Sequence, residues 1–146
     1  MPTTSFASPL LYIKVKDNNV CVFTKSNVEK TYNNQVLIYI GKIDEINAFH
    51  DSYSKIYLNL KLPIIESNCI TIPTSEFQEN EPYDIVLETD KSYARRICLK
   101  KDANNSLQLL GVEKGYNCKA TQYDYSSNIF FSKLKNLYYW LASFFN

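Results

Sequence analysis

The stretch LLYIKVKDNNVCVFTK, residues 10–25, decides the fold of this chain. Two runs rich in valine, isoleucine and aromatic residues, 10–16 and 19–25, flank the pair Asp17-Asn18. Aspartate and asparagine tolerate the positive φ angle that a tight hairpin turn requires. The stretch therefore predicts two antiparallel strands joined by a two-residue turn.

The same two-residue period recurs along most of the chain. It predicts further strands over residues 35–41, 56–62, 69–72, 83–88, 93–100, 107–112 and 117–123. The alternation is clearest in 56–62, where we expect Ile56, Leu58, Leu60 and Leu62 to share one buried face. Asn-Asn pairs at 18–19, 33–34 and 104–105 lie at or beside the inferred turns, where asparagine would replace glycine.

Three segments depart from this period. Residues 44–53 carry a loose helical stripe and predict a short helix, and the polar residues 73–82 predict a long loop. Residues 126–146 predict an amphipathic α-helix. The expected fold is thus mainly β (α+β): one domain, 1–146, with a barrel or sandwich of about seven to nine mostly antiparallel strands in 1–125 and a C-terminal helix.

The predicted C-terminal helix has an unusually wide apolar side. At 100° per residue its apolar arc spans about 220°, whereas a helix that lies on one sheet needs only about 100°. A deep groove in its own domain, another protein chain or a membrane surface could cover the second flank. We favour an interaction or assembly module that docks a protein partner or a second copy of itself through the aromatic residues Tyr138, Trp140, Phe144 and Phe145.

The composition argues against most cofactor and metal chemistry. Only three glycines occur, and no glycine-rich phosphate-binding motif is present. His50 is the one histidine, which excludes a multi-histidine metal site. The formal net charge of +1 gives no overall attraction for nucleic acid. We therefore expect no cofactor, no metal site, no nucleic-acid partner and no enzymatic activity.

The four cysteines bear on the compartment. Cys21, Cys69 and Cys98 lie inside apolar or alternating runs. This placement favours free buried thiols over the alternative, in which these three cysteines and Cys118 form two disulfide bridges. Residues 1–11 show no signal peptide, and no run of 18 apolar residues occurs. We expect a cytoplasmic, reducing location. The fifteen asparagines and twelve tyrosines are typical of an AT-rich genome, as in many viruses and some bacteria.

One stretch offers an enzymatic alternative. Tyr83-Asp84-Ile85, followed by Arg96-Ile97-Cys98-Leu99-Lys100, resembles the core of the PD-(D/E)xK nucleases. The resemblance implies that Asp84 would help to hold Mg²⁺ and that Lys100 would assist cleavage. Cys98 departs from the family pattern, because it stands where a second acidic or amide residue belongs.

Overall fold

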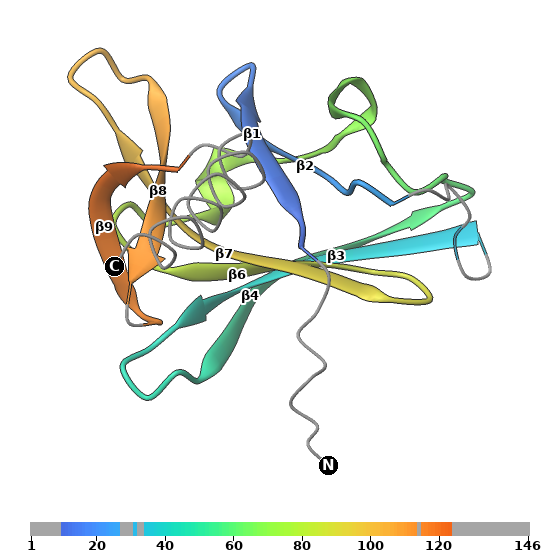
Figure 1. Ribbon diagram of the computed structural model, residues 1–146, viewed down its shortest axis with the longest axis horizontal. Helices are drawn as coiled ribbons and strands as arrows, with labels where there is room; N and C mark the ends of the chain where they lie inside the picture. Colours follow the sequence, from blue (N-terminus) through green and yellow to red (C-terminus); the bar gives the residue numbers. More distant parts are fainter. Residues whose placement is uncertain (1–9, 27–30, 32–33, 114, 124–146) are drawn as a thin grey trace, which may run out of the picture.

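The computed structural model describes residues 10–26, 31, 34–113 and 115–123, and in these ranges it is a mainly β structure of two antiparallel sheets (Figure 1). The smaller sheet has the order β1-β2-β5 and the larger one β4-β3-β6-β7-β8-β9. The nine strands are β1 (Tyr12–Lys16), β2 (Asn19–Phe23), β3 (Gln35–Ile43), β4 (Phe49–Leu58), β5 (Ile70–Ile72), β6 (Tyr83–Glu88), β7 (Ser92–Lys101), β8 (Leu107–Glu113) and β9 (Asn117–Gln122). The predicted strand number is confirmed, and the sheets do not close into a barrel.

The core lies between the inner faces of the two sheets. In β6, Tyr83, Ile85 and Leu87 are at most 2% exposed, while the alternate residues face outward. Opposite them, the small sheet contributes the inward side chains of Ile13 and Ile72. Each large aliphatic side chain buried in this way stabilises the fold by roughly 1.5–3 kcal/mol. The alternating sequence pattern therefore explains why the sheets pack face to face.

Asparagine and aspartate form the turns, as the sequence predicts. Asp17 and Asn18, with φ angles of 51° and 60°, join β1 to β2, so that Lys16 pairs with Asn19. Two positive φ angles in a two-residue loop suit the right-handed twist of the flanking strands. Other asparagines with positive φ are Asn34, Asn47, Asn59, Asn80 and Asn105.

The expected helix over 44–53 is wrong, because these residues form a turn and the first half of β4. An Asp44 carboxylate oxygen accepts hydrogen bonds from the backbone N–H groups of Ile46 (3.0 Å) and Ala48 (2.9 Å). The side chain of His50 lies 2.7 Å from the other oxygen, and this hydrogen bond, with those from the backbone, lowers the pKa of Asp44. Local turn chemistry thus outweighs a loose helical stripe.

The buried face predicted for 56–62 is also wrong in its first half. Ile56 and Leu58 are 60% and 65% exposed, while Tyr53 and Tyr57 on the other face pack against the core. The strand ends at Leu58, and Asn59 adopts a φ of 56°. This turn interrupts the alternation, so the apolar residues on its two sides do not share a face.

The expectation of free thiols is wrong, because all four cysteines form disulfides. Cys21 of β2 bonds to Cys69, and Cys98 of β7 bonds to Cys118 of β9, with Cα–Cα distances of 5.5 and 5.8 Å. Strand order brings together cysteines that are 48 and 20 positions apart. Disulfides persist mainly in oxidising compartments, so the reducing location loses its support.

Two expectations concern helices. Among the described residues, no helix has the length and apolar character needed to cross a bilayer. The predicted C-terminal helix, residues 126–146, lies outside the described residues, as do the candidate docking residues Tyr138, Trp140, Phe144 and Phe145.

The disulfide between Cys98 and Cys118 gives the first testable prediction. Replacing both residues by serine should lower the free energy of unfolding by about 2–4 kcal/mol, since the bridge restricts the unfolded chain. Urea unfolding of the protein folded in a glutathione redox buffer measures this loss. The wild type, denatured without reductant, should show no titratable thiol, and four reactive thiols would contradict the assignment.

Candidate functional site

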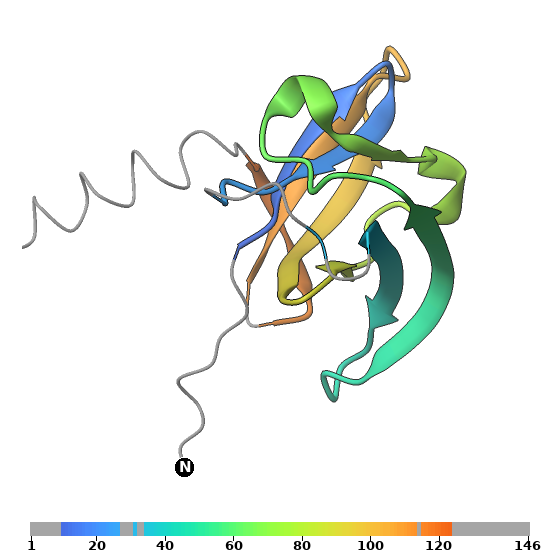
Figure 2. The same ribbon diagram turned by 90° about the vertical axis from the view of Figure 1, so that its right-hand side faces the viewer.

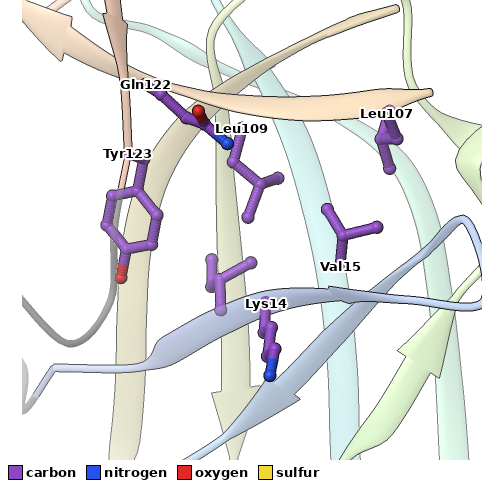
Figure 3. Close-up of a pocket in the computed structure, with 7 residues that line it drawn as sticks. Lys14, Val15, Leu107, Leu109, Gln122 and Tyr123 are labelled. Atoms are coloured by element: carbon purple, nitrogen blue, oxygen red, sulfur yellow. The ribbon is translucent and has the colours of Figure 1, made fainter. Parts of the chain in front are cut away.

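A groove opens between the two sheets, where β1 and β8 approach each other without pairing (Figure 3). Its volume is about 530 Å³. The lining residues come from three strands or their ends: Ile13, Lys14 and Val15 of β1, Leu107 and Leu109 of β8, and Gln122 and Tyr123 at the end of β9. At one end of the groove, the N–H of Leu107 donates to the side-chain oxygen of Asn18 (3.1 Å), which links β8 to the turn between β1 and β2.

The groove has an apolar floor and a polar rim. Ile13, Leu107 and Leu109 belong to the main core and are at most 8% exposed. Gln122 and Tyr123 contribute polar groups to the rim, whereas the side chain of Lys14 points away from Leu107 and Leu109 (Figure 3) and forms an ion pair with Glu66. Such a combination is typical of sites that take an apolar side chain and orient it with few polar contacts.

Tyr123 lies at one end of the groove and is held from two sides. Its N–H donates to the carbonyl oxygen of Leu109 (2.7 Å), and the guanidinium of Arg95 lies 5.3 Å from the centre of its ring. Arg95 also donates from Nε to the carbonyl oxygen of Leu11 (3.0 Å), so it connects β7 to the start of β1. In the sequence, the aromatic segment 126–146 begins three residues after Tyr123.

Sequence reasoning missed this groove. The four residues predicted to dock a partner lie outside the described residues, so their positions stay untested. The groove depends on which strands are neighbours, and β1 and β8 are more than 90 residues apart in the chain. No local pattern carries that information.

A second cavity, of about 360 Å³, lies where the start of β1, the end of β2 and the turn before β7 meet. Its lining consists of Leu10, Tyr12, Lys25, Ser26, Lys91 and Tyr93. The Nζ atom of Lys25 lies 5.1 Å from the centre of the Tyr12 ring, and the opposite wall includes the buried Tyr93. The two lysines are 66 positions apart, which is why no sequence motif joined them.

The residues of the nuclease resemblance are engaged in other contacts. The two carboxylate oxygens of Asp84 accept from Nε and Nη2 of Arg96, at 2.6 and 2.9 Å. The sulfur of Cys98 is bonded to Cys118, so it offers no thiolate to a metal. Lys100 pairs with Gln108 of β8, beyond the part of β7 that faces β6. The arrangement that the resemblance implies is not formed.

Arg96 instead acts as a tether. Its Nη1 donates to the side-chain oxygen of Asn47 (2.5 Å) and to the carbonyl oxygen of Gly115 (2.6 Å). The hydrogen bonds to Asp84 are the main reason that the pKa of Arg96 is raised above its ordinary value. One guanidinium therefore joins β6, the turn before β4 and the turn before β9.

Comparison with known proteins adds no assignment. The chain matches no protein-family model, and no curated protein or solved structure shows significant similarity to it. The groove between β1 and β8 and the cavity beside Lys25 and Lys91 are therefore the features that bear on its function.

Replacing Arg96 by alanine should lower the free energy of unfolding by about 1–2 kcal/mol, because a charge-assisted bidentate pair and two further hydrogen bonds are lost at a partly exposed position. Urea unfolding measures the change. Lys100→Gln, which removes one positive charge from an exposed strand position, serves as the control and should change stability by less than about 0.5 kcal/mol. If R96A is as stable as K100Q, Arg96 is not a tether.

Proposed function

We propose that this chain is a protein-interaction module, in which the aromatic segment 126–146 docks a protein partner or a second copy of the chain. The groove between β1 and β8 can cover only part of the wide apolar arc predicted for this segment, and the rings that it leaves uncovered dock the partner. The single observation that carries the proposal is the mismatch between the groove and the segment that follows it.

The groove is too small for all the rings of the segment. An apolar cavity of about 150 Å³ holds one benzene ring. By that measure a groove of about 530 Å³ takes three or four rings. Six aromatic residues lie on the apolar arc predicted for the segment: Phe130, Phe131, Tyr138, Trp140, Phe144 and Phe145. At least two of these rings are left without cover from the groove.

The remaining rings would favour association. A large aromatic side chain buries roughly 150–250 Å², and at about 25 cal/mol per Å² each ring is worth roughly 4–6 kcal/mol of burial free energy. Tyrosine and tryptophan are frequent anchors of protein interfaces, because they combine apolar area with a polar group. We assign this role to Tyr138, Trp140, Phe144 and Phe145.

The disulfides suggest where the module works. One bridge joins β2 to Cys69, just before β5, and the Cys98–Cys118 bridge joins β7 to β9, which leads to Tyr123. We therefore propose an oxidising compartment as the site of action. The nuclease alternative is not carried further, because Asp84 and Cys98 have other partners.

Adjacent tyrosines provide a matched test of the docking flank. Tyr138 lies on the apolar arc of the predicted helix and Tyr139 on its polar side, so Tyr138→Ala should weaken association and Tyr139→Ala should not. Multi-angle light scattering of both variants and the wild type measures self-association. A chain truncated after Ser132, checked for folding by circular dichroism, should be monomeric.

A fluorescent dye that binds exposed apolar surface covers the case of a different partner. A monomeric wild type that binds the dye through the segment, with binding reduced in Y138A and unchanged in Y139A, would support the proposal. A monomeric wild type that binds no dye would show that the chain covers its own segment, and it would contradict the docking flank.

A further inference from the structure

We propose that the cavity formed by Leu10, Tyr12, Lys25, Ser26, Lys91 and Tyr93 binds a phosphate group carried by a small organic molecule or a lipid head group. This inference is independent of the docking proposal, because none of the six residues lines the groove between β1 and β8. It starts from the charges around the cavity.

Two lysines line this cavity, and none of the described residues that line it is acidic. No ion pair joins Lys25 or Lys91 to a carboxylate elsewhere in the described ranges. Two like charges around one cavity repel each other, and a bound anion removes that repulsion and gains two charge-assisted contacts. The charge pattern therefore favours an anionic ligand.

The surrounding residues hold the two lysines in place. Lys25 lies over the ring of Tyr12, which itself stacks on Phe23 with 5.9 Å between the ring centres. Lys91 is part of the tight turn between β6 and β7, where its carbonyl oxygen accepts from the N–H of Thr89 (2.9 Å). The ammonium of Lys25 is thus placed by an aromatic ring and the backbone of Lys91 by a turn, which reduces the entropy lost when a ligand binds.

The size of the cavity indicates a phosphate ester rather than a bare ion. A water molecule takes about 30 Å³ in the liquid, so a cavity of about 360 Å³ has room for a phosphate and an attached organic group. Leu10 is 49% exposed and gives that group an apolar contact. A phosphate monoester carries a charge of about −1.5 to −2 at pH 7, which matches two lysines.

A nucleic acid fits this site less well. Proteins that bind a nucleic-acid backbone neutralise several phosphates along a track of basic residues. Here two lysines meet in one cavity, on a chain whose formal net charge is +1. The chemistry that we infer is a single phosphate group.

The test uses glycerol 3-phosphate as the probe. Titration into ¹⁵N-labelled protein, at constant ionic strength against chloride, should give saturable shifts of the backbone signals of Lys25 and Lys91. Lys25→Gln and Lys91→Gln should each weaken binding about tenfold, the loss expected for one charge-assisted contact. Lys100→Gln changes the net charge equally at a distant exposed position, and binding should stay within about twofold of wild type.

Vesicles distinguish the two sources of the phosphate. Flotation with phosphatidylcholine vesicles, with and without phosphatidic acid, tests the lipid head group, while glycerol 3-phosphate tests the free ester. Binding that depends on both lysines, in either arm, supports the proposal and identifies the source. The proposal is overturned if neither probe binds, or if the K25Q and K91Q variants bind as well as K100Q.

Discussion

The unequal width of the two sheets is the constraint on which the rest of the structure depends. Neighbouring strands lie about 4.8 Å apart, so three strands span about 10 Å and six span about 24 Å. The small sheet therefore covers only part of the inner face of the large one. The uncovered ends of the large sheet need other cover, and they receive it in different ways.

At the β4 end, the chain itself provides the cover. After Asn59 it turns back, and Leu60, Leu62 and Ile64 pack against the core. Toward the β9 end, the large sheet bends so that β8 comes close to β1 (Figure 2). β1 and β8 do not pair there, and the groove remains. The apolar floor of this groove is the continuation of the core, which is why it suits an apolar segment.

Much of the fold could be predicted from the sequence, because local rules decide it. The strand over 83–88 follows from the apolar residues at its alternate positions 83, 85 and 87, and the turn at Asp17-Asn18 follows from the φ angles that these residues tolerate. The predictions of secondary structure and of the buried face failed where a single turn residue interrupted the sequence pattern. Asp44 caps a turn within a segment with a helical stripe, and Asn59 reverses the face of the residues that follow it.

The candidate sites could not be predicted, because strand order creates them. Cys21 meets Cys69, and Lys25 meets Lys91, only after the sheets have assembled. The separation of these residues in the chain says nothing about such encounters. In contrast, the excess of aromatic residues in 126–146 is a property of the sequence alone. The structure adds the size of the groove that Tyr123 lines, and a segment packed into that groove would have more rings than the groove can hold.

The emission of Trp140, the only tryptophan of the chain, tests this mismatch most directly. In the dilute monomer the account predicts emission at long wavelength and ready quenching by acrylamide, because we assign Trp140 to the rings that the groove leaves uncovered. Raising the protein concentration, or adding a partner, should shift the emission to shorter wavelength and protect it. Short-wavelength emission that resists quenching in the dilute monomer would contradict the account, because the chain would then bury the ring by itself.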